Sequence, residues 1–149
     1  MANSKAEKAA KQKYEKLYFS EEFLRDWRAE LCHSLNLKSV EELPALFRMP
    51  LALPAEIGTF KILKTRYEIR GDRARKNLSR ALWRYFSSDQ YAEAILTIET
   101  RRTLEMKESA PVNDYDRKRY RKRLKRKHQK RKRQMRQAAA AHSGDGAVF

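Results

Sequence analysis

Four basic residues repeat at intervals of three and four within one short stretch of the chain. They are Arg73, Lys76, Arg80 and Arg84. On a helix this spacing aligns the side chains in one row along the axis. Between positions 61 and 84, nine basic residues face only two acidic ones, so the row favours binding to phosphate groups. An ordinary solvated charged face is the alternative interpretation.

The stretch that carries this row has the pattern of an amphipathic helix. Its other face holds Leu78, Ala81, Leu82 and Tyr85. This spacing predicts a helix over residues 72–86. The next four residues, 87–90, predict the start of a further helix, with Ser87 as N-cap and Gln90 completing a capping box.

Other elements follow from similar signals. Ser20 stands before two glutamates and an apolar stripe, which predicts a helix that begins near residue 20. A short helix is expected after Ser39, delayed or disturbed by Pro44, and another from about Phe60 to Gly71. β-branched and alternating residues at 100–106 suggest a small hairpin.

The charge of the chain indicates a polyanionic partner. Its 149 residues carry a formal net charge of +16 and give a pI near 10.2. Basic side chains gain free energy by releasing the counterions condensed on phosphates, although membrane surfaces are polyanions too. The charge is also polarised, with −3 over residues 19–60 and +7 over residues 61–84.

Basic segments are expected at both ends of one domain. We predict an arm over residues 1–19, a domain over 20–110 and a tail over 111–149. In the tail, 14 of the 21 residues from 117 to 137 are Lys or Arg, with no acid among them. Self-repulsion predicts that such a tail is disordered alone and becomes helical once phosphates neutralise it. A non-specific polycation is an equally good interpretation.

Several classes of protein are disfavoured by residue content. A lone Cys32 and three histidines offer no metal-ligand spacing and no internal disulfide. Cys32 beside His33 could be a nucleophile with its base, but neighbours on a helix point in different directions. The sequence has no Gly-rich phosphate loop and no paired carboxylates whose pKa values would be perturbed. We therefore expect no enzyme, no metal and no cofactor. No run of 18 apolar residues and no leader pattern occurs, so we expect a cytoplasmic protein that does not bind membranes.

Three motifs stand in the same order as those of a known family. Residues 54–63 are similar to the pattern P-L-x-I-G-I-x-x-D-L, residues 78–91 to L-R-x-A-L-x-x-Y-T-S-S-x-x-Y-L, and Thr100-Arg101 to the start of T-R-x-D-L-x-G. The chain resembles the FinO/ProQ RNA-binding domain over about residues 20–110. The run Ala-Leu-x-x-Tyr-x-Ser-Ser-x-x-Tyr at 81–91 is the most specific part.

The resemblance implies a mostly helical, compact domain with a small β-hairpin. It also implies a site for the base of a terminator-type hairpin and its single-stranded 3′ tail. Ser87 and Ser88 would hold a phosphate at a helix N-terminus, and Tyr91 would stack on or hydrogen-bond a terminal nucleotide. Arg101 matches the arginine that closes this pocket, and Arg75 stands where the family is usually basic. Structurally, Tyr91 could instead be ordinary core, and the serines could be caps alone.

Some positions depart from the family pattern. Glu56, Ser79 and Gln90 stand where basic residues are common, and the hairpin turn has become Glu105-Met106-Lys107. Pro50 could also be the true match to the first motif in place of Pro54. In that alignment the chain has four more residues than the family pattern before Leu78, and Arg75 no longer matches the basic position of the family.

The leading hypothesis is a monomeric RNA chaperone that acts in post-transcriptional regulation. It would bind structured small or antisense RNAs and promote their pairing with messenger RNA. Its RNA-binding residues would be Arg73, Arg75, Lys76, Arg80, Arg84, Ser87, Ser88, Tyr91 and Arg101. The alternatives are a structural RNA-binding component of a ribonucleoprotein particle and a DNA-binding repressor that uses the row as a recognition helix.

Overall fold

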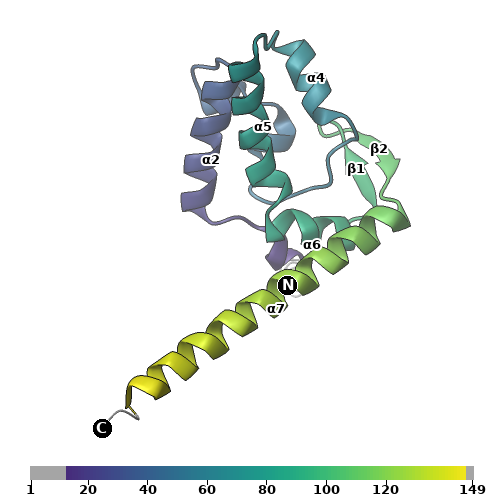
Figure 1. The fold of residues 1–149 in the computed structure, drawn as a ribbon. Coiled ribbons are helices and arrows are strands. Elements are labelled where there is room, and N and C mark those ends of the chain that lie inside the picture. The colour runs from purple at the N-terminus through teal and green to yellow at the C-terminus, as the bar shows by residue number, and fades with distance from the viewer. Residues whose placement is uncertain (1–12, 147–149) are drawn as a thin grey trace, which may run out of the picture.

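The protein folds as a small helical body from which one long helix projects (Figure 1). The computed structural model describes residues 13–146, with side chains described as far as residue 142. The helices are η1 (Glu15–Leu17), α2 (Glu21–Ser34), η2 (Val40–Glu42), α3 (Ala45–Arg48), α4 (Thr59–Arg66), α5 (Asp72–Phe86), α6 (Asp89–Thr97) and α7 (Asp114–Gly146); the strands are β1 (Thr100–Arg102) and β2 (Glu108–Pro111). The two strands pair antiparallel, so the predicted mostly helical fold with a small hairpin is confirmed.

An aromatic cluster joins α2 to α5 at the centre of the body. Trp27 of α2 is fully buried, and its indole N–H donates to the carbonyl of Ala81 in α5 over 2.8 Å. Tyr85 stacks on Trp27 with ring centroids 5.0 Å apart, and Phe47 meets both rings edge-on. The face of α5 that was predicted to be apolar, residues 78, 81, 82 and 85, is buried as expected.

An extended segment, residues 51–55, passes through the interior beside this cluster. Buried backbone groups need hydrogen-bond partners, and a segment outside any sheet must find them elsewhere. Two tyrosine hydroxyls supply them: Leu53 N–H donates to Tyr85 and Ala55 N–H donates to Tyr91, each over 3.2 Å. The segment therefore connects α5, α6 and, through the hydrogen bond from Arg102 N–H to the Pro54 carbonyl, the hairpin.

The N-terminal arm that we predicted over residues 1–19 reaches into the core at its end. Leu17 and Phe19 are buried, and Phe19 N–H donates to the Pro50 carbonyl. The apolar side chains of this short piece outweigh its lysines, so it packs rather than remaining solvated. Residues 1–12 of the predicted arm lie outside the described part of the chain.

The C-terminal segment differs from the disordered tail that we predicted. Residues 114–146 form α7, whose first turn holds Asp114 and Asp116 and whose start is capped by the Asn113 side chain. Tyr120 and Leu124 pack its inner face against the body, where α7 crosses α6. Packing against the folded body supplies the stabilising free energy that the basic sequence does not have as an isolated helix. From position 128 to 142 every side chain is exposed.

Removal of one core hydroxyl should test the role of the extended segment. Tyr85→Phe leaves the Leu53 N–H buried without its acceptor, so we expect the free energy of unfolding to fall by about 1–3 kcal/mol. Urea unfolding followed by circular dichroism measures this. Tyr115→Phe, at an exposed position, is the matched control and should change stability by less than about 0.5 kcal/mol. Equal stability of both variants would contradict the assignment.

Candidate nucleic-acid interface

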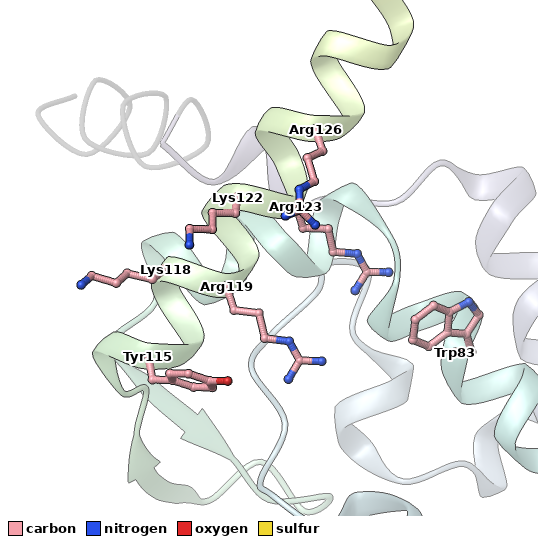
Figure 2. A pocket seen from close by; sticks show the side chains of 7 residues that line it. All are labelled: Trp83, Tyr115, Lys118, Arg119, Lys122, Arg123 and Arg126. Atoms are coloured by element: carbon pink, nitrogen blue, oxygen red, sulfur yellow. The ribbon is translucent and has the colours of Figure 1, made fainter.

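A basic groove lies between α5 and the first half of α7 (Figure 2). It has a volume of about 630 Å³ and is lined by Trp83, Tyr115, Lys118, Arg119, Lys122, Arg123 and Arg126. We call it the α5–α7 groove. The Trp83 and Tyr115 side chains are 61% and 74% exposed, which is unusual for rings of this size.

The sequence of α7 explains how the cations gather in this groove. The five basic residues that line the groove follow Tyr115 by three, four, seven, eight and eleven positions, a spacing that groups them along one broad side of the helix. The face that holds Tyr120 and Leu124 is packed against the body instead. In Figure 2, Arg119 and Arg123 extend toward Trp83, whereas Lys118 and Lys122 point the other way.

The charges of the groove are not neutralised within the described residues. None of its five cations forms an ion pair with a carboxylate there. Arg123 instead lies over the indole of Trp83, with its guanidinium carbon 5.0 Å from the ring centroid. Free cations beside exposed rings are the combination that binds nucleic-acid strands, through phosphates and stacked bases respectively.

The predicted basic row on α5 is exposed at three of its four positions. Arg73, Lys76 and Arg80 face solvent, as does the neighbouring Arg75. Arg84 differs, because it pairs with Glu30 of α2 and lies over the ring of Phe23. The charge of Arg84 is thus neutralised by an acid on another helix, although no acid stands at a matching spacing in the sequence.

The predicted start of α6 needs a correction of one residue. Ser87 is the C-cap of α5, and Ser88 is the N-cap of α6, with its hydroxyl accepting from Tyr91 N–H and donating to the Tyr85 carbonyl. The tight passage between the two helices leaves no room for Ser87 to cap the second one. Because both functions of the Ser88 hydroxyl are used internally, this oxygen has a structural role in the free protein.

Cations of α7 cover the same helix start. Lys127 donates to the Ser87 carbonyl over 2.7 Å and to Asp89 over 3.0 Å, and Arg131 donates to Asp89 over 2.7 Å. Burial works to raise the pKa of the Asp89 carboxyl, but the hydrogen bonds and charges of Lys127 and Arg131 outweigh it and hold that pKa below its ordinary value. A carboxylate and two cations therefore occupy the place where we predicted an RNA phosphate.

Tyr91 and Arg101 belong to a buried network rather than to an open pocket. Only 3% of Tyr91 and 6% of Arg101 is exposed. Tyr91 accepts from Ala55 N–H, Arg101 donates to the Ala55 carbonyl over 2.9 Å, and Arg101 also pairs with Asp116 of α7. Burial raises the pKa of Tyr91 to about 12, so its hydroxyl stays protonated. In this conformation the two residues support the site from within, and their contact with RNA stays a prediction.

The pair of residues considered for nucleophilic chemistry does not form a site. Cys32 is buried while His33 is exposed, and burial, followed by the charges of Glu42 and Glu41, raises the pKa of the Cys32 thiol. A raised pKa disfavours the reactive thiolate. Within residues 13–146, no group of three or more His, Cys, Asp or Glu residues could hold a metal ion.

Sequence reasoning missed the exposed indole of the site. Trp83 stands between Arg80 and Arg84 on the polar side of an otherwise amphipathic helix. A large aromatic residue on a charged face is itself a signal of a binding surface. The individual groove residues of α7 were also missed, because the tail was treated as a featureless polycation.

The fold is a small helical domain, and its groove combines cations with exposed rings, as the surfaces of nucleic-acid-binding proteins do. The model of the ProQ/FINO family matches residues 32–137, and the chain belongs to that family of non-enzymatic RNA-binding proteins and RNA chaperones. Neither the curated proteins nor the solved structures contain a match to the chain. In the part of the chain that the structure describes, no helix is long and apolar enough to cross a membrane.

Acid titration should reveal the contact between α7 and Asp89. Because the pKa of Asp89 is lower in the folded than in the unfolded protein, its ion pairs stabilise fully above about pH 4 and are lost as the pH falls through the folded pKa. We expect Asp89→Asn to lower the melting temperature at neutral pH and to weaken the dependence of that temperature on pH below about pH 4. Thermal unfolding at a series of pH values measures both.

The matched control is Asp26→Asn, which removes an exposed carboxylate paired with an exposed Arg25. Exposed pairs contribute little, so this variant should keep the wild-type pH profile. If Asp89→Asn also keeps that profile, the ion pairs of Asp89 with Lys127 and Arg131 do not contribute to holding α7 on α6.

Proposed function

We propose that this protein is an RNA chaperone of post-transcriptional regulation that holds RNA in the α5–α7 groove. Its RNAs would be small or antisense RNAs, bound at a hairpin base and the single-stranded 3′ tail, and the protein would promote their pairing with messenger RNA. The observation that carries the proposal is a groove lined by two exposed rings and five cations, none of which forms an ion pair within the described residues. Family membership supports the general role in RNA binding.

The shape of the surface supports a division between duplex and tail. The exposed cations of α5, namely Arg73, Arg75, Lys76 and Arg80, suit a phosphate backbone read by its shape. The groove alongside, with its rings, suits an unpaired strand. The remaining predicted contacts, Arg84, Ser87, Ser88, Tyr91 and Arg101, stay part of this proposal, although Tyr91 and Arg101 are buried and Arg84 pairs with Glu30 in the free protein.

Engagement of the α6 start by RNA would require an exchange of partners. Lys127 and Arg131 bind Asp89 in the free protein, and both could turn to a phosphate. The phosphate would then replace the carboxylate as acceptor, at a helix N-terminus that favours an anion. RNA binding at this place would therefore loosen α7 from α6 without unfolding the core.

The promotion of pairing needs two RNAs near one another and no covalent chemistry. The exposed half of α7 beyond Lys127 offers a second cationic surface, separate from the groove. One RNA in the groove and another on this helix would meet at a raised local concentration. The same helix also favours the second candidate, a structural component of a ribonucleoprotein particle, in which basic segments pass through folded RNA.

Competition binding at raised salt separates these functions. We expect a U-tailed hairpin to compete better than the same hairpin with a blocked 3′ hydroxyl, and much better than duplex DNA. A structural component would bind one RNA stoichiometrically without regard to the 3′ end. Equal affinity for all three competitors would reject the chaperone proposal and leave a non-specific polycation.

Neutralisation of the groove should lower both affinity and its dependence on salt. In the groove variant, Lys118, Arg119, Lys122 and Arg126 are replaced by Gln. Loss of four phosphate contacts should reduce the slope of log affinity against log salt by about 3. Fluorescence anisotropy with a labelled hairpin, repeated over a range of salt concentrations, measures the slope.

The control variant removes the same charge from the exposed half of α7, by Gln at Lys130, Lys132, Arg133 and Arg136. It should lose less affinity for a single hairpin than the groove variant does. If the two variants lose equal affinity, the groove has no special role and binding is spread over the whole helix.

A further inference from the structure

Trp83 also lines a second hollow. It has a volume of about 160 Å³ and is lined by Phe60, Ser79, Leu82, Trp83 and Phe86. The same indole therefore borders both a largely apolar hollow and the cations of the α5–α7 groove. We call this space the Trp83 hollow.

The walls of the hollow suit a flat ring. Leu82 is buried at its floor, and Phe60 and Phe86 are partly buried against the core. The hydroxyl of Ser79 has no hydrogen-bond partner among the described residues, so it is free to meet the polar edge of a ligand. The hollow is therefore apolar with one hydrogen-bonding group at its side.

The neighbouring charge selects among the ligands that such a hollow could take. Arg123 lies against the indole from the side of the groove, and Arg119 extends toward the same ring in Figure 2. An apolar peptide side chain would make no favourable electrostatic contact with these cations. A nucleotide would, because its base is a flat ring and its phosphate is an anion a few bonds away.

We propose that the Trp83 hollow receives one unpaired base of the bound RNA, while the adjoining phosphates lie along Arg119 and Arg123. This inference rests on the proposed function and adds a base-binding position to it. Stacking against Trp83 needs a base that is not already stacked in a helix. The hollow thus favours a tail, loop or bulge over a continuous duplex, and Ser79 contributes the hydrogen bond that can distinguish one base edge from another.

The test compares a hairpin that carries a single-stranded tail with the same hairpin cut to a blunt end. Trp83→Ala should weaken binding of the tailed RNA by about tenfold, in the range found for one stacked base. It should leave the blunt hairpin within about twofold of wild type. Trp83→Tyr keeps a stacking ring and should retain most of the affinity for the tail.

A second variant separates the hollow from the groove. Ser79→Leu fills the hollow with apolar bulk while Trp83 and every cation of the groove stay unsubstituted, and it should lower affinity for the tailed RNA alone. The controls are Val40→Ala, an exposed apolar position on η2, and a thermal unfolding curve for each variant. Trp83 and Ser79 are both exposed, so all variants should fold as the wild type does.

A direct readout comes from 2-aminopurine placed at successive positions of the tail. Its fluorescence should be quenched at one position by the wild type and not by Trp83→Ala. If Trp83→Ala weakens tailed and blunt RNAs equally, Trp83 acts only by holding Arg123, and the base-binding proposal is wrong. It is also wrong if neither Trp83→Ala nor Ser79→Leu changes RNA binding. A wild-type protein that binds neither RNA would instead reject the proposed function itself.

Discussion

The relative placement of α5, α6, β1 and α7 depends on how the chain satisfies the peptide groups of one buried extended segment. Leu53 and Ala55 donate to the hydroxyls of Tyr85 and Tyr91, and the Ala55 carbonyl accepts from Arg101. These partners come from α5, α6 and β1, so a single strand of backbone fixes three elements relative to one another. Since Arg101 also pairs with Asp116, the start of α7 is tied to the same point. The α5–α7 groove exists because the two helices that form it share this anchor.

Ion pairs within the protein then determine which cations stay available to bind a ligand. Acids on other elements pair with several basic residues; among them, Glu30 binds Arg84, and Asp89 binds Lys127 and Arg131. The five cations of the groove have no such partner among the described residues, although their mutual repulsion disfavours the folded state. A polyanion relieves that repulsion on binding. The cations of α7 thus fall into two groups. Lys127 and Arg131 hold α7 against α6, and the cations of the groove stay available for a ligand.

Local patterns predicted much of the fold but little of the site. The helix over residues 72–86 and the N-cap of Ser20 were right because both depend on neighbours within a turn or two. The Ser87 cap was wrong by one residue, since two helices meet there with no loop between them and both serines fit the local pattern. The burial of Tyr91 and the ordered start of α7 depend on contacts between distant segments, which spacing along the chain does not reveal. Trp83 was missed because the helix was interpreted from its apolar face and its basic row, and this ring belongs to neither.

The length of α7 sets a distance that matters for an RNA chaperone. From Lys127 to Arg136, the last Lys or Arg of the helix, the axis rises by roughly 14 Å, at about 1.5 Å per residue. The Debye length under physiological salt is about 8 Å, so phosphates held at the two ends of this cationic stretch are largely screened from one another. Two RNA strands bound one at each end would repel each other weakly. Their bases could therefore approach one another while both strands stay bound.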